Sequence, residues 1–128
     1  MKRIKVVCGI IYNDKRKIFI ARKKEGKHLS GYWEFPGGKI KPNETNEDAL
    51  IREIHEELNM DILIAKYIGS NIHQYENLEV NLIAYECKYM PSNIRLLDHD
   101  AFRWVDKSEV TQYLISPADL PLIELIDN

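Results

Sequence analysis

The chain has 128 residues, of which 45% are hydrophobic and 30% are charged, a balance typical of one globular domain and not of a disordered chain. Its formal net charge of −2 argues against a protein that coats a nucleic-acid polymer, and no apolar run approaches the roughly 20 residues that span a bilayer. The run Val6–Ile11 is too short for a signal peptide. We therefore expect a cytoplasmic protein, with Cys8 and Cys87 as buried free thiols and a disulfide as the less favoured interpretation.

In chain order, β-rich runs and turn signals predict strands first, then a helix, then more strands and two further helices. The segment from Lys23 to Gly31 is polar with two glycines and is expected to be a loop. The expected strands are Ile4–Tyr12, its hairpin partner Lys17–Arg22, Trp33–Phe35, Ile62–Ile72, Leu78–Tyr89 and Phe102–Val105. The expected helices are Asn46–Leu58, Lys107–Leu114 and Pro117–Ile126. This order indicates a mixed α/β sandwich.

The helix expected at Asn46–Leu58 carries signals at both ends. Thr45 is a suitable N-cap, because its hydroxyl can accept a hydrogen bond from the first turn. Leu50, Ile54 and Leu58 recur every fourth residue and form a core-facing stripe. Asn59 follows where a left-handed residue commonly ends a helix.

The opposite face of this helix is acidic. Glu53, Glu56 and Glu57 stand at i, i+3 and i+4, so three carboxylates share one side. Arg52 can relieve at most one or two of these charges. The helix alone leaves two interpretations open, a solvated acidic face or a set of oxygen ligands for Mg²⁺ or Mn²⁺.

The spacing of residues around the acidic face resembles the Nudix box. Gly38, Glu44, the pair Arg52-Glu53 and the pair Glu56-Glu57 occur at the family's spacing, and only Asn59 departs, where the family usually has Gly. The closest group is that of MutT-type nucleoside triphosphate pyrophosphohydrolases, which three further segments resemble: Trp33–Lys39, Leu97–Asp100 ahead of Trp104, and Ser116–Pro121. The resemblance implies a single domain over residues 1–128, folded as an α/β/α sandwich around a mixed sheet.

The resemblance also implies a chemistry and a set of residues. The metal is expected to be Mg²⁺, with Mn²⁺ as an alternative, and Arg52 is expected to orient the carboxylates. Glu53 is the expected general base, and His99 is the alternative, although its simpler interpretation is a solvated or structural histidine. The implied metal ligands are Glu53, Glu56, Glu57, a backbone carbonyl of Gly37 or Gly38, and Asp98, with Asp100 as the alternative to Asp98 because the family more often has Glu there.

The implied reaction is hydrolysis of a nucleoside triphosphate to the monophosphate and pyrophosphate, by attack of water at the β phosphorus. Asp119 matches the base-reading position, and the other implied substrate contacts are Lys23, Phe35, Lys39 and Leu78. The expected substrate is of the 8-oxo-dGTP type. A carboxylate at residue 119 brings CTP and 5-methyl-CTP into contention, because it accepts hydrogen bonds from an amine. A non-catalytic nucleotide sensor is the alternative of another class, and either a monomer or a homodimer is expected.

Overall fold

The strongest apolar runs form the centre of one mixed sheet. A computed structural model describes residues 1–127. The sheet runs in the order β3 (Trp33–Glu34), β2 (Ile18–Lys23), β1 (Lys2–Tyr12), β6 (Leu78–Met90) and β5 (Asp61–Tyr75). Two further strands complete it, since β4 (Gly37–Lys39) pairs with β1 and β7 (His99–Val105) pairs with β2. Among the strands of residues 1–127, only β1 and β6 pair with each other in parallel, from Lys2 opposite Leu78 to Tyr12 opposite Lys88.

The central strands are apolar on both faces because both faces of the sheet are covered. In β1, Val7 and Ile11 face one core, whereas Ile10 and Tyr12 face the other. The same alternation holds in β2, where Ile18 and Ile20 lie in one core and Phe19 and Ala21 in the other.

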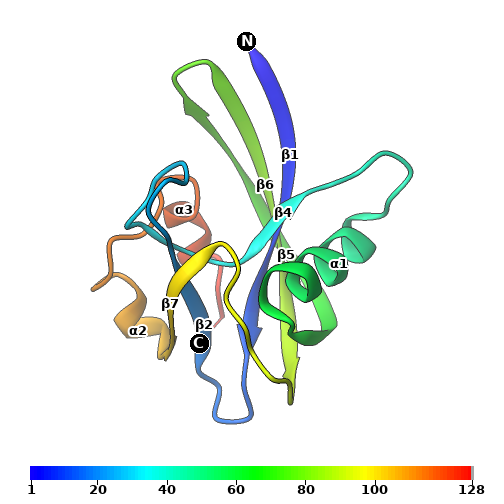
Figure 1. Ribbon diagram of the computed structural model, residues 1–128, viewed down its shortest axis with the longest axis vertical. Helices are drawn as coiled ribbons and strands as arrows, with labels where there is room; N and C mark the ends of the chain where they lie inside the picture. Colours follow the sequence, from blue (N-terminus) through cyan, green and yellow to red (C-terminus); the bar gives the residue numbers. More distant parts are fainter. Residues whose placement is uncertain (128) are drawn as a thin grey trace.

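Helices complete the two cores. The helix α1 (Asn46–Leu58) covers one face, and the short helices α2 (Lys107–Val110) and α3 (Leu120–Ile123) cover the other (Figure 1). The predicted sandwich with a mixed sheet is therefore confirmed. None of the helices in residues 1–127 combines the length and apolarity that a bilayer crossing requires. Cys8 and Cys87 are both buried free thiols, as expected.

Two predictions of local structure were partly wrong. The strands β1 and β2 pair only at Tyr12 and Ile18, next to the turn, because β4 occupies the remaining edge of β1 from Val6 to Cys8 and β7 and β3 pair with β2. The expected hairpin of β1 and β2 is therefore limited to one residue pair beside the turn, and the two strands separate beyond it.

The two C-terminal helices are shorter than predicted because backbone groups bond elsewhere. After α2, the Trp33 N–H donates to the Leu114 carbonyl at 2.8 Å and the Ser116 N–H donates to the Trp33 carbonyl at 2.9 Å. Before α3, the Ala118 N–H donates to the Tyr75 hydroxyl at 3.0 Å. These tertiary bonds replace the helical ones.

Candidate functional site

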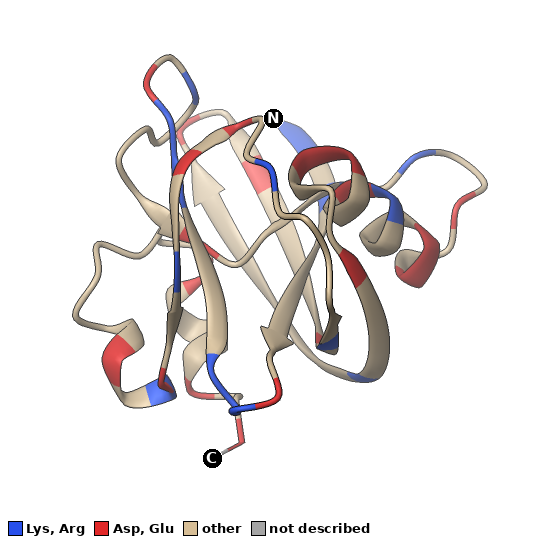
Figure 2. Ribbon diagram, turned by 60° about the horizontal axis from the view of Figure 1, so that its bottom comes forward, with Lys and Arg blue, Asp and Glu red and all other residues tan. Residues whose placement is uncertain are grey.

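The helix α1 is fixed at both ends by the predicted caps. The Thr45 hydroxyl accepts a hydrogen bond from the Asp48 N–H at 3.0 Å. Asn59 adopts the left-handed conformation, with φ 52° and ψ 37°, and its N–H donates to the His55 carbonyl at 2.9 Å. Since Leu50 is fully buried on the core side, the opposite side of α1 must carry the acidic residues. Figure 2 shows acidic segments in red along this helix.

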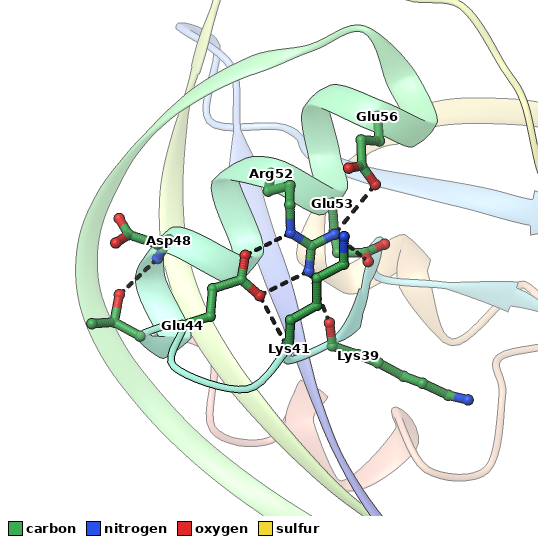
Figure 3. Close-up of polar contacts among 8 residues, drawn as sticks. Lys39, Lys41, Glu44, Asp48, Arg52, Glu53 and Glu56 are labelled. Carbon is green, nitrogen blue, oxygen red and sulfur yellow. Dashed lines mark hydrogen bonds and ion pairs between the residues drawn. The ribbon is translucent and has the colours of Figure 1, made fainter.

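Arg52 is the centre of a hydrogen-bond network on α1 (Figure 3). Its guanidinium donates to both oxygens of Glu44, at 2.6 and 2.9 Å. It also donates to Glu53 at 2.8 Å and to Glu56 at 3.2 Å, and to the Lys39 carbonyl at 3.1 Å. The guanidinium thus holds two carboxylates of α1, those of Glu53 and Glu56, and ties α1 to β4.

The pKa values of this network follow from the same contacts. Hydrogen bonding from Arg52, and then from the Lys41 N–H, lowers the pKa of Glu44 to about 2. The bonds to Glu44 and Glu53 raise the pKa of Arg52 above its usual value. Both groups are therefore charged throughout the neutral range.

The glycines of β4 allow two close approaches that a side chain would block. A Cβ on Gly37 would collide with the Val7 carbonyl of β1, and a Cβ on Gly38 would collide with the Glu53 carboxylate. Glycine at 38 therefore lets the backbone of β4 lie directly against the Glu53 carboxylate.

A cavity of about 380 Å³ opens beside this contact. Its acidic lining comprises Glu34, Glu53, Glu57 and Asp98, and its basic lining comprises Lys23, Lys27 and Lys39. Burial, and next the neighbouring carboxylates of Glu53, Glu34 and Asp98, raise the pKa of Glu57 to about 9. The carboxylates around Glu57 therefore disfavour its ionised form in the metal-free protein.

The donor chemistry of this cavity fits a hard divalent cation. Glu53, Glu57 and Asp98 line it with carboxylate groups, together with Gly37 and Gly38, and oxygen ligands are those that Mg²⁺ and Mn²⁺ prefer. Within residues 1–127, no three acidic, His or Cys side chains already converge as a metal cluster. A cation would relieve the charge crowding that acts on Glu57.

Two of the predicted ligands lie differently from the rest. Glu56 does not line this cavity. It lines an adjoining hollow that it shares with Glu57, because Arg52 draws its exposed carboxylate to one side. Asp98 lines the cavity but is paired with Lys27 at 3.0 Å. Its alternative, Asp100, pairs with Arg22 at 2.6 Å instead.

His99 is neither solvated nor in a loop. It is the first residue of β7 and is 4% exposed. Its Nε2 lies 2.8 Å from Glu34 Oε2, so the structural interpretation of this histidine is the one that the contacts favour. The strand expected at Phe102–Val105 begins three residues earlier than predicted, at His99, which pairs with Lys23 of β2.

A second cavity, of about 350 Å³, adjoins the first. It is lined by Asp119 and by three of the other predicted substrate contacts, Lys23, Lys39 and Leu78. Its lining includes apolar side chains of β1 and β6, namely Ile4, Val6, Leu78, Val80 and Leu82, and apolar side chains with a few polar groups are the character of a site for a flat organic group.

Asp119, in the lining of this second cavity, is fixed by a hydrogen bond to the backbone. Its Oδ2 accepts a hydrogen bond from the Phe35 N–H at 2.9 Å, and the residue is 5% exposed. Burial, and next the charge of Glu34, raise the pKa of Asp119 well above its usual value. Two side chains fix the preceding residue: the Tyr75 hydroxyl accepts from the Ala118 N–H, and the Asn71 amide donates to the Ala118 carbonyl, both at 3.0 Å.

The Phe35 side chain does not line the substrate cavity. It is 2% exposed and belongs to the core between the sheet and α3, because alternation along the chain directs it inward. Phe35 contributes to the site through its backbone N–H, which donates a hydrogen bond to Asp119. Trp33 is also buried, whereas the aromatic side chain of Tyr75 lines the cavity.

Sequence reasoning missed several residues that line these cavities, among them Lys27, Glu34 and His28. Glu34 lines both of them, and the only local signal was its place beside Phe35 in a strand-like run. His28 lines the second cavity, with its ring edge-on to Tyr75 at a centroid distance of 5.2 Å. A loop histidine gives no such indication in the sequence.

Comparison with known proteins places this geometry in a family. The family model for the NUDIX domain matches residues 6–125. A CTP pyrophosphohydrolase of Escherichia coli (strain K12) is 35% identical over 124 residues, which cover 97% of this chain and 91% of that protein. An 8-oxo-dGTP diphosphatase of Proteus vulgaris is 35% identical over 81 residues, which cover 63% of this chain and 72% of that protein. A solution NMR structure of the DNA mismatch repair protein MutT, a Nudix hydrolase from methicillin-resistant Staphylococcus aureus 252, has 38% identity and a TM-score of 0.76, and the match covers 97% of this chain and 95% of that one.

Proposed function

The chain belongs to the Nudix hydrolase family and is of the MutT type, and on this premise we propose that it hydrolyses nucleoside triphosphates to monophosphate and pyrophosphate with a divalent metal ion. The observation that carries the proposal is that the acidic cavity and the apolar cavity share Lys23, Glu34 and Lys39 in their linings. A base in the apolar cavity would thus direct its phosphates along the two lysines to the carboxylates of α1.

The metal and the acidic residues have separate tasks in this proposal. Mg²⁺ held by Glu53, Glu57 and Asp98, with Glu56 recruited by side-chain rotation, would neutralise phosphate charge and acidify a water molecule. Glu53, held by Arg52 and by the close backbone of Gly38, accepts the proton of the attacking water. We propose attack at the β phosphorus, because a reacting pair must lie within roughly 3–3.5 Å and the two cavities fix the ends of the substrate.

Two nucleobases are the leading candidates. The name of the Proteus relative favours 8-oxo-dGTP. The carboxyl group of Asp119 and the E. coli relative that matches nearly the whole chain favour CTP or 5-methyl-CTP. A carboxylate accepts a hydrogen bond from the cytosine amine, and it also accepts from the N1–H and N2 amine of guanine. The two candidates are therefore separated by measurement and not by the chemistry of Asp119 alone.

The deciding experiment measures pyrophosphate release across a nucleotide panel that includes 8-oxo-dGTP, dGTP, CTP and 5-methyl-CTP, with Mg²⁺ and with Mn²⁺. We expect one nucleotide to be preferred, and Glu53→Gln to lower kcat by at least about 100-fold. Glu47→Gln is the matched control, since Glu47 lies in the exposed first turn of the same helix. Hydrolysis in ¹⁸O-water tests the point of attack, and label in the monophosphate would refute attack at the β phosphorus.

The same panel tests the alternative of a nucleotide sensor. Binding of triphosphate without any pyrophosphate release would favour a sensor. We propose an enzyme because each acidic position of the box is present. Buried free thiols at Cys8 and Cys87 support a proposed cytoplasmic location, since reducing compartments maintain thiols.

A further inference from the structure

Glu34 lies where the two cavities meet, and neither the metal chemistry nor base reading uses it. It is the only carboxylate among residues 1–127 that lines both cavities. Glu53 and Glu57 line only the acidic cavity, and Asp119 lines only the apolar one. In a nucleotide, the group between the base and the phosphates is the sugar.

A buried histidine holds Glu34 in a defined orientation. His99 Nε2 lies 2.8 Å from Glu34 Oε2, and the His99 side chain is 1% exposed, compared with 22% for that of Glu34. The other ring nitrogen, Nδ1, is buried and has no hydrogen-bond partner among the described residues. A buried N–H without a partner is costly, so we assign the ring proton to Nε2, which donates it to Glu34.

This arrangement leaves Glu34 with one oxygen committed and the other free. In residues 1–127, the carboxylate of Glu34 makes its side-chain hydrogen bond to His99 alone. An ionised carboxylate only accepts hydrogen bonds, so the group opposite Oε1 must be a donor. An ionised phosphate chain offers no donor and would be repelled, whereas each sugar hydroxyl is a donor.

We propose that Glu34, oriented by His99, accepts a hydrogen bond from a sugar hydroxyl of the nucleotide and thereby sets the sugar specificity of the site. This inference rests on the proposed function for the direction in which the nucleotide lies. Glu34 is the specificity-determining residue, and His99 is a positioning residue that acts through it.

The test removes the hydroxyl and the carboxylate separately and together. With the best base from the panel, kcat/KM is measured for the ribo, 2′-deoxy, 3′-deoxy and 2′,3′-dideoxy triphosphates in the wild type, Glu34→Ala and Glu34→Gln. Because a hydrogen bond to a charged acceptor is strong, we expect loss of the contacted hydroxyl to lower the wild-type kcat/KM by about 10- to 100-fold. In Glu34→Ala the same loss should cost less than about 3-fold, because the partner is already absent. Glu34→Gln should give an intermediate ratio, since its amide oxygen is a weaker acceptor, and Glu25→Gln, in the exposed loop after β2, should behave as the wild type.

The role of His99 is tested by the same ratio. His99→Leu should reduce the discrimination between sugars, and His99→Gln should restore part of it, because its amide can donate to Glu34. A residue that only stabilises the fold would change kcat/KM for all four sugars equally. Equal ratios in the wild type, Glu34→Ala and His99→Leu would overturn the inference, as would a change in base preference alone.

Binding separates this inference from the proposed function. Calorimetry with the α,β-methylene triphosphates of the same sugar series measures the ratio without turnover. Sugar discrimination that Glu34→Ala abolishes, in a protein that hydrolyses no triphosphate, would support the inference and refute the proposed enzyme. The absence of nucleotide binding would overturn both.

Discussion

Replacing Glu57 by Gln is expected to stabilise the metal-free protein while it abolishes activity. Glu57 has a pKa of about 9 in the folded protein and 4.5 as its ordinary value, because it is buried beside Glu53, Glu34 and Asp98. Between these two pH values the folded state holds a proton that the unfolded state has released. The free energy of unfolding must therefore fall as the pH rises through this window.

The size of the effect follows from the width of the window. One pKa unit corresponds to about 1.4 kcal/mol, so the upper bound between about pH 5 and pH 8 is roughly 4 kcal/mol. Glu57 is partly accessible to solvent and its side chain can rotate toward water, so we expect about 2 kcal/mol. The variant Glu57→Gln should lose this pH dependence and exceed the wild type in stability at pH 8 by the same amount.

The assay is urea denaturation in EDTA at several pH values, followed by circular dichroism. Glu56→Gln is the control on the same helix, because the Glu56 side chain is 52% exposed, and it should change the free energy of unfolding by less than about 0.5 kcal/mol. Added Mg²⁺ should stabilise the wild type more than Glu57→Gln. A Glu57→Gln protein that is less stable than the wild type at pH 8 would refute the reasoning.

Three further substitutions test the contacts around the site. The lysine of Arg52→Lys cannot reproduce the two bonds to Glu44 together with the bond to Glu53. We therefore expect kcat, measured by steady-state kinetics, to fall by about 10-fold or more, while a thermal melt should show that the metal-free protein still folds. Gly38→Ala places a Cβ in the Glu53 carboxylate and should lower kcat about 100-fold with an unchanged circular dichroism spectrum; wild-type kinetics would contradict this contact. Asn59→Ala must hold a left-handed conformation without the amide and should lose about 1 kcal/mol in urea denaturation, whereas an unaltered midpoint would mean that the helix end has moved.

The local features of α1 were predictable from the sequence because their causes lie within a few residues. Thr45 and Asn59 act through bonds to neighbours three or four positions away, and the stripe ending at Leu58 follows the helical period. The spacing of the carboxylates was readable for the same reason. Their distribution was not, since Arg52 turns Glu56 away from the cavity that Glu57 lines.

The remainder of the site depends on contacts between distant segments. Glu34 lies in β3 and His99 lies in β7, and these strands are far apart in the sequence. The two side chains meet because both strands pair with β2, one at each edge. The pairing of β4 with β1, which replaces most of the expected hairpin with β2, could not be predicted either, because nothing near Asn13 indicates it. Phe35 illustrates a third limit. A motif identifies the position, but the backbone N–H of Phe35 bonds to Asp119 while its side chain is buried in the core.

The parallel pairing of β1 with β6 has a consequence for the order of folding. A strand near the start of the chain must wait for residues 78–88 before its longest ladder can form, and closing so long a loop costs entropy before any of its contacts contribute. The antiparallel ladder of β5 and β6, joined by a tight turn, can form first and offer β6 as a template. We therefore expect a slow step in which β1 docks last, between a preformed β5–β6 ladder and the backbone of β4. During that interval both apolar faces of β1 are open to solvent, and a newly made chain is most exposed to aggregation at that stage.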